Sequence, residues 1–135
     1  MSVIVHGSEG MDSTLIIVSL IQIILDPDCR TIRGFEALIE REWIKGGHPF
    51  ASRCTHLAYG KSKATIAVPD SPTFLLFLDC VWQICNQFSR SFEFTDALLI
   101  FIFDNAYASE FGTFLCNSEK EKLENGVKSR TISLW

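Results

Sequence analysis

SVIVHGSEGMDSTLIIVSLIQIIL, residues 2–25, carries the pattern that decides the fold. Three consecutive β-branched residues within Ser2–His6 run into a glycine-containing turn and predict a short buried strand. The next four residues form a loop with two glycines, and Asp12 or Ser13 is a typical N-cap for a helix that starts near Thr14. A strand, a glycine loop and a helix N-terminus in this order favour anion binding by backbone N–H groups and the helix dipole.

The predicted helix body, Leu15–Leu25, is apolar at nine of its eleven positions. A helix that is apolar all round is expected to be central and covered on every side. Asp26-Pro27-Asp28 ends it, because proline disfavours helical backbone in the residue before it. The run is too short to span a membrane, which takes about 20 residues, and Ser19 and Gln22 interrupt it.

Apolar residues spaced by three and four predict further helices. We expect an amphipathic surface helix over Gly34–Ile44 that ends at Gly46-Gly47. Phe74–Phe88 is expected as a helix with an aromatic core stripe formed by Phe74, Phe77, Trp82 and Phe88. Asp96–Tyr107 fits a strand by its apolar run, but its length and the possible cap at Thr95 favour a helix. The remaining predicted elements are a charged helix at Ser118–Glu124 and short extended pieces at Thr65–Val68 and Thr131–Trp135.

Length and charge limit the classes of function. The chain has 135 residues, a size that fits one small domain, and a net charge of −4. This balance argues against nucleic acid as a partner, since phosphate contacts need basic residues. Yet 47% of the residues are hydrophobic and the mean hydropathy is +0.21. This composition is apolar for a small domain that covers its own core.

The cysteines indicate a reducing compartment. There are five of them, an odd number, with no CxxC pair, and residues 1–10 do not form a secretory signal. Reduced thiols in a cytosolic protein are the simplest interpretation. Cys54, His56 and His48 match no zinc-binding spacing. We therefore expect no metal site and no cofactor.

The glycine loop has the framework of a cysteine-dependent phosphatase without its reactive groups. Such enzymes place a thiolate nucleophile first in the loop and, six residues later, an arginine that grips two phosphate oxygens. The matching positions here are Gly7 and Ser13. The whole loop resembles that of the myotubularin phosphatase family, whose active form reads HCSDGWDRT. It comprises His6, Gly7, Ser8, Glu9, Gly10, Met11, Asp12, Ser13 and Thr14.

The resemblance extends over nearly the whole chain apart from the segment around Lys61–Asp70. The other family-like stretches are Leu25-Asp26-Pro27, Arg30–Glu36, Glu42-Trp43, Gly47-His48, Phe74-Leu75, Asp79–Gln83, Phe92–Phe94, Phe111–Asn117 and Ser133–Trp135. The resemblance implies an α/β, cysteine-phosphatase-like fold, mostly helical here, with one strand leading into the loop. Residues 1–135 would be the C-terminal part of that phosphatase-like domain, and hence an incomplete domain. The excess of apolar residues would then face the missing part.

Two departures from the active pattern decide the expected chemistry. Gly7 has no thiol to form a phosphocysteine, and Ser13 has no charge to hold a phosphate. Glu9 and Asp12 leave the loop with two carboxylates and no basic partner within it. Asp12 matches the family's general acid, but without a covalent step it is interpreted as a cap or loop-structuring residue. We expect no catalytic residue, as in the catalytically inactive subgroup of the family.

The resemblance implies a pseudophosphatase that binds and regulates an active myotubularin phosphatase acting on 3-phosphorylated phosphoinositides. The expected complex is heteromeric and cytoplasmic, on the periphery of endomembranes that it would reach through regions absent from this chain. A first alternative is an enzyme, either a residual phosphatidylinositol-3-phosphate phosphatase or a hydrolase that uses Ser8 with His48 or His56 as base. A second is a passive phosphoinositide-binding module in which the loop is an anion pocket.

Overall fold

The computed structural model describes residues 3–54 and 71–135, and its regular structure is helical. Short 3₁₀ or π segments, marked η, join the α-helices. The elements in chain order are α1 (Ser13–Leu25), η1 (Pro27–Arg30), α2 (Ile32–Leu38), η2 (Ile39–Ile44), α3 (Phe50–Cys54), α4 (Thr73–Gln87), η4 (Ser89–Ser91), α5 (Asp96–Tyr107), α6 (Glu119–Glu124) and α7 (Val127–Arg130).

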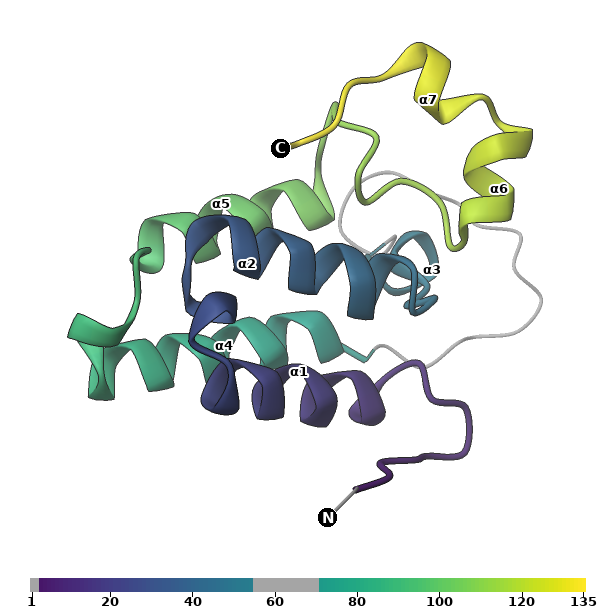
Figure 1. Cartoon of the computed structure of the whole chain (residues 1–135). Helices are drawn as coiled ribbons and strands as arrows, with labels where there is room; N and C mark the ends of the chain where they lie inside the picture. The colour runs from purple at the N-terminus through teal and green to yellow at the C-terminus, as the bar shows by residue number, and fades with distance from the viewer. Residues whose placement is uncertain (1–2, 55–70) are drawn as a thin grey trace.

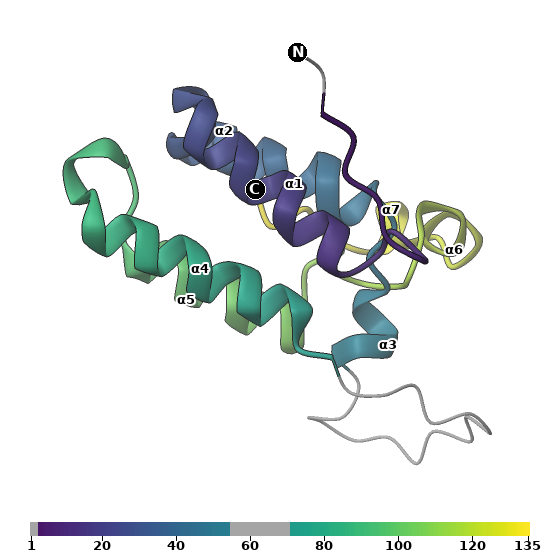
Figure 2. The ribbon, with the colours of Figure 1, turned by 90° about the horizontal axis from the view of Figure 1, so that it is seen from below.

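Four helical segments form the body of the molecule. Figure 1 shows α1 beside α4, with the continuous segment α2–η2 and helix α5 above them. In Figure 2, seen from below, α1 overlies α2–η2 and α4 overlies α5. Helix α1 packs against both α4 and η2, and α4 packs against α5. The short helices α6 and α7 lie together beside one end of this body, near the C-terminal segment (Figure 1).

The predicted strand at the N-terminus is wrong. The described part of Ser2–His6 is irregular, and Val3 and Ile4 are 72% and 87% exposed. A strand is stable only beside another strand that takes up its backbone hydrogen bonds, and the described residues supply none. Thr131–Trp135 is also irregular. Isolated hydrogen bonds hold this segment in place, such as the one that the Gly112 N–H donates to the Ile132 carbonyl over 2.9 Å. Thr65–Val68 lies outside the described residues.

Helix α1 has the predicted position but not the predicted surroundings. It begins at Ser13 and ends at Leu25, where Asp26 and Pro27 start the 3₁₀ turn η1. Only one face is buried, because Ile17, Ile21 and Ile24 form an exposed stripe whose members lie four and three residues apart. The prediction that this helix is covered on every side is therefore wrong for the described chain. None of the helices described here is long and apolar enough to cross a membrane.

The core is centred on Trp43. Its indole Nε1–H donates a hydrogen bond to the buried Ser19 hydroxyl of α1 over 3.0 Å. Its ring lies 4.9 Å, centroid to centroid, from both Phe74 and Phe77 of α4, and Phe77 is stacked on Phe35 of α2. These rings join three elements, and together with Ser19 they are called the Trp43 core below. Aromatic pairs at these separations contribute about 0.5–1.5 kcal/mol each beyond the area that they bury.

The segment that carries Trp43 differs from a regular α-helix. The sequence predicts one amphipathic surface helix over Gly34–Ile44, whereas the structure continues α2 as the π segment η2 from Ile39. The Lys45 N–H accordingly donates to the Glu40 carbonyl five residues back, over 3.0 Å. The apolar stripe of this segment is fully buried whereas Arg33 and Arg41 on its other side are exposed, so the segment is amphipathic as predicted. Gly47, with φ of +88°, follows and ends the helical run.

Helices α4, α5 and α6 match their predicted ranges within one residue, whereas α7 was not predicted. In α6, the Ser118 hydroxyl caps the helix by accepting the Glu121 N–H. The predicted aromatic stripe of α4 is correct only in part, since Phe74 and Phe77 are buried but Trp82 and Phe88 are 45% and 59% exposed. Trp82 lies at the edge of the apolar arc of α4, and Phe88 follows the last residue of that helix.

Candidate functional site

The loop at residues 6–14 leads into the N-terminus of α1 at one end of the helical body (Figure 1). Most of its side chains are exposed, including Ser8, Glu9 and Ser13. Gly10 has φ of +73°, a backbone conformation that glycine adopts without strain, and open space lies around its Cα. The loop therefore has the shape of a turn into a helix, as the sequence predicts.

Asp12 is the residue of the loop that the fold holds most firmly. It occupies the N-cap position of α1 as predicted, but its side chain does not cap the helix. One carboxylate oxygen, Oδ2, accepts a charge-assisted hydrogen bond from Nη2 of Arg53 over 2.6 Å. The other oxygen, Oδ1, accepts the hydroxyl of Thr73 over 3.1 Å. Residues of α3 and α4 thus fasten the loop to the helical body.

His48 completes this group of polar residues. Its Nδ1–H donates to the Met11 carbonyl over 2.9 Å, and Nδ1 lies 3.6 Å from Oδ1 of Asp12. Burial lowers the pKa of His48, while the Met11 carbonyl and the Asp12 charge oppose that shift without reversing it. The imidazole is therefore neutral at pH 7. Asp12, His48, Arg53 and Thr73 are called the Asp12 cluster below.

The cluster changes the electrostatics that the sequence indicated for the loop. Within the loop, Glu9 and Asp12 have no basic neighbour, but Arg53 from α3 neutralises Asp12. Sequence reasoning did not find Arg53 or Thr73, which lie 41 and 61 residues from Asp12. The partial signal was Asp12 itself, a carboxylate placed at a helix start, where either a cap or a tertiary partner is expected. The structure provides the tertiary partner.

The two positions that would carry phosphatase chemistry lie side by side at the entrance to α1. A Cβ atom added to Gly7 would lie 2.8 Å from Oγ1 of Thr14 and 3.8 Å from Oγ of Ser13. Any side chain at position 7 would therefore displace the Thr14 hydroxyl, which fills the space. Neither Gly7 nor Ser13 offers a nucleophile of the required reactivity or a positive charge.

Four of the five cysteines do not compensate for the missing thiolate. Burial raises the pKa of Cys54 and that of Cys85 to about 11. Both thiols are therefore protonated at neutral pH, the opposite of the activated state that phosphoryl transfer needs. Burial also raises the pKa of Cys29 and Cys80.

The structure does not assemble a hydrolase from Ser8 and His48. Ser8 is exposed, whereas His48 is buried and uses Nδ1 for the Met11 carbonyl. His56, the other candidate base, lies outside the described residues, as does its part in a metal site with Cys54. Among the described residues, no group of three or more His, Cys, Asp or Glu side chains is arranged to hold a metal ion.

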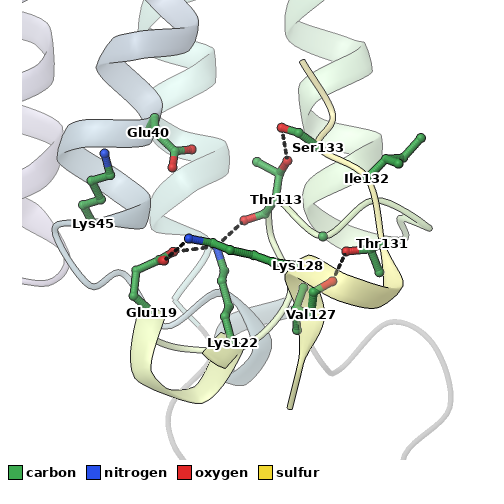
Figure 3. A pocket seen from close by; sticks show the side chains of 11 residues that line it. Glu40, Lys45, Thr113, Glu119, Lys122, Val127, Lys128, Thr131, Ile132 and Ser133 are labelled. Atoms are coloured by element: carbon green, nitrogen blue, oxygen red, sulfur yellow. Dashed lines mark hydrogen bonds and ion pairs between the residues drawn. The ribbon is translucent and has the colours of Figure 1, made fainter. Parts of the chain in front are cut away.

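A pocket of about 320 Å³, which the sequence did not predict, lies between η2 and the C-terminal segment (Figure 3). Lys122 and Lys128 converge there on Glu119, with N–O distances of 3.2 and 3.6 Å. Lys122 also donates to the Thr113 carbonyl over 2.8 Å. Burial alone would raise the pKa of Glu119, but the two lysines outweigh it and hold the pKa below its ordinary value. The two lysines exceed the single carboxylate by one positive charge, and their ion pairs with Glu119 link α6 to α7.

Comparison with known proteins places these features in context. The sequence model described as "Myotubularin-like phosphatase domain" matches residues 1–123. The chain is 58% identical over 134 residues to myotubularin-related protein 9 of Bos taurus and 57% identical to that of Homo sapiens. It is 46% identical over 134 residues to the phosphatidylinositol-3,5-bisphosphate 3-phosphatase MTMR2 of Mus musculus. Each match covers 99% of this chain but only 24%, 24% and 20% of the respective relative.

Proposed function

The chain belongs to the myotubularin phosphatase family, and we propose that it acts there as a pseudophosphatase, a binding partner that regulates an active member. The active partner would remove 3-phosphates from phosphoinositides at cytoplasmic membranes. The chain spans about a quarter of the length of its relative myotubularin-related protein 9. The proposed function is therefore that of a whole protein of which the chain is similar to one part.

One observation carries the proposal: the glycine loop still leads into the N-terminus of α1, although without the predicted strand, and it lacks the reactive groups. Gly7 and Ser13 replace the thiol and the guanidinium of the active pattern, and Arg53 holds the Asp12 carboxylate. Loss of a nucleophile alone typically lowers an enzyme's rate by several orders of magnitude. A loop without these groups is suited to binding, and because the chain is similar both to myotubularin-related protein 9 and to the phosphatase MTMR2, we take an active relative as the partner.

The test measures phosphate release from phosphatidylinositol 3,5-bisphosphate vesicles by MTMR2 as the 135-residue chain is titrated in. We expect the chain alone to release no phosphate above background and to change the rate of MTMR2 until the effect saturates. The matched control is the same titration with the chain after heat unfolding, which should have no effect. An unchanged MTMR2 rate at every chain concentration would contradict the proposal.

The same assay separates the enzymatic alternatives. Phosphate release by the chain alone would indicate residual phosphatase activity. An ester substrate tests the Ser8 hydrolase, and only hydrolysis that Ser8→Ala abolishes would support it. We expect neither activity, because Gly7 and Ser13 lack the thiol and the guanidinium, and because Ser8 is exposed whereas His48 is buried with its Nδ1 bonded to the Met11 carbonyl.

Passive phosphoinositide binding by the loop is a second candidate, favoured by the ion pair of Asp12 with Arg53. That pair leaves Glu9 as the loop carboxylate that opposes an anion. Titration of the chain with vesicles containing phosphatidylinositol 3-phosphate, against vesicles without it, tests this candidate. Glu9→Gln should strengthen binding if the loop is the site and leave it unchanged if it is not.

A further inference from the structure

A groove of about 240 Å³ runs between α4 and α5 and contains none of the loop residues. Figure 2 shows the two helices lying one over the other along their length. The residues used in the argument are Leu75, Asp79 and Trp82 of α4 with Asp96, Ile100 and Phe103 of α5. The groove thus has apolar walls and two carboxylates.

The groove has an acidic end and an apolar end. Helices α4 and α5 are antiparallel, because the short segment Phe88–Thr95 connects the end of one to the start of the other. Asp96, the first residue of α5, therefore lies at the connected end, to which Trp82 belongs on α4. Leu75 and Phe103 lie toward the opposite end, and Asp79 lies between. A bound segment would meet charge at one end and apolar side chains at the other.

Large apolar side chains that line the groove are about half exposed to solvent. Trp82 is 45% exposed and Ile100 is 57% exposed. Aromatic side chains that are partly exposed next to aliphatic ones are typical of protein interfaces, where they act as anchors. The groove is lined from two packed helices, and a groove between two helices accepts the apolar ridge of a third helix.

The charge identifies the kind of partner. Helices α4 and α5 contain three acidic residues, Asp79, Asp96 and Asp104, and no lysine or arginine. A negative potential attracts a cationic protein segment. It disfavours a lipid surface, because cytoplasmic membranes are anionic and bind basic surfaces. The same argument separates this groove from any site for phosphate.

We propose that the α4–α5 groove is a docking site for an amphipathic helical segment of a partner protein, with apolar residues at helical spacing and lysine or arginine at one end. The apolar residues would contact Trp82, Ile100 and their neighbours, and the basic residues would pair with Asp79 and Asp96. The proposal uses none of the loop residues and holds whether or not the chain regulates a phosphatase.

The test uses a fluorescein-labelled synthetic peptide with leucines at positions i, i+3, i+4 and i+7 and arginines at one end. Fluorescence anisotropy measures its binding to the full 135-residue chain. We expect saturable binding that weakens as salt is added, since part of the attraction is electrostatic. A matched peptide with glutamates in place of the arginines should not bind. Equal binding of the two peptides, or no saturable binding, would overturn the proposal.

Variants locate the binding to the groove. Asp79→Asn combined with Asp96→Asn should weaken binding of the arginine peptide by about tenfold, as should Trp82→Ala, the scale of one interface anchor. Asp104→Asn, which removes an acidic group of α5 outside the groove, is the matched control and should leave binding unchanged. If circular dichroism shows that Trp82→Ala is unfolded, the double variant with Asp79→Asn and Asp96→Asn still tests whether the peptide binds in the groove. Binding to phosphatidylserine vesicles that competes with the peptide would overturn the choice of a protein partner.

Discussion

The Trp43 core and the Asp12 cluster are neighbouring regions built on opposite principles. The core joins α1, α2, η2 and α4 through aromatic rings and one buried hydrogen bond. The cluster joins the loop to α3 and α4 through an ion pair and hydrogen bonds. They meet at His48, whose ring lies edge-on to that of Trp43 at 5.1 Å. The comparison teaches that the loop is held by specific partners, whereas the body is held by apolar burial.

The largest expected effect comes from removing the centre of the core. Trp43→Ala leaves a cavity among Phe74, Phe77 and Ser19 and should lower the free energy of unfolding by about 3–5 kcal/mol. Because small domains are stable by only about 5–15 kcal/mol, this variant would be close to unfolding. Urea denaturation followed by circular dichroism measures the change.

The matched control for this substitution is Trp82→Ala, which removes the same side chain from a half-exposed position. It should cost about 1 kcal/mol or less. Equal losses for the two variants would contradict the central place of Trp43 and would imply that the α4–α5 groove is part of the core.

A smaller effect is expected from breaking the cluster. Asp12→Ala leaves the mostly buried Arg53 without its carboxylate and should lower the free energy of unfolding by about 1–3 kcal/mol. Glu9→Ala, at an exposed carboxylate of the same loop, should change it by about 0.5 kcal/mol or less. The two urea midpoints distinguish a loop that is fastened through Asp12 from one that is not. Indistinguishable midpoints would remove the assigned role of Asp12.

The smallest expected effect is a dependence of the free energy of unfolding on pH that arises from the titration of His48. Its pKa in the folded protein lies below the ordinary value of 6.5, so the unfolded chain takes up a proton first as pH falls. This contribution to stability is therefore present above pH 6.5 and is lost progressively below it. Comparison of urea midpoints at about pH 7.5 and about pH 5.5 brackets the transition.

His48→Asn is the control for the pH effect, because an asparagine amide can still donate a hydrogen bond to the Met11 carbonyl and does not titrate. Its midpoint should fall less between the two pH values than that of the parent chain. An equal fall in both proteins would assign the pH dependence to carboxylates instead of to His48.

Much of the fold was predictable because the helices are local patterns. The boundaries of α1, α4, α5 and α6 follow from apolar periodicity, from the Ser118 cap of α6 and from a proline, all readable within a few residues of chain. The Thr95 side chain, predicted to cap α5, makes no cap hydrogen bond. The state of Ser2–His6 could not be predicted from local sequence, because a strand forms only beside a neighbouring strand that takes up its hydrogen bonds. The prediction that residues 1–135 form the C-terminal part of a larger domain stays a prediction.

The candidate site divides in the same way. The absence of a thiol at Gly7 and of a guanidinium at Ser13 is a property of the residues themselves, so the sequence alone determined that these two positions carry neither group. Tertiary structure alone decided that Arg53 and Thr73 hold Asp12, and that Trp82 faces a groove instead of the core. The physical reason is range. Residue type and periodicity act along the chain, whereas the partner of a carboxylate and the cover of an aromatic ring are set by segments that folding brings together.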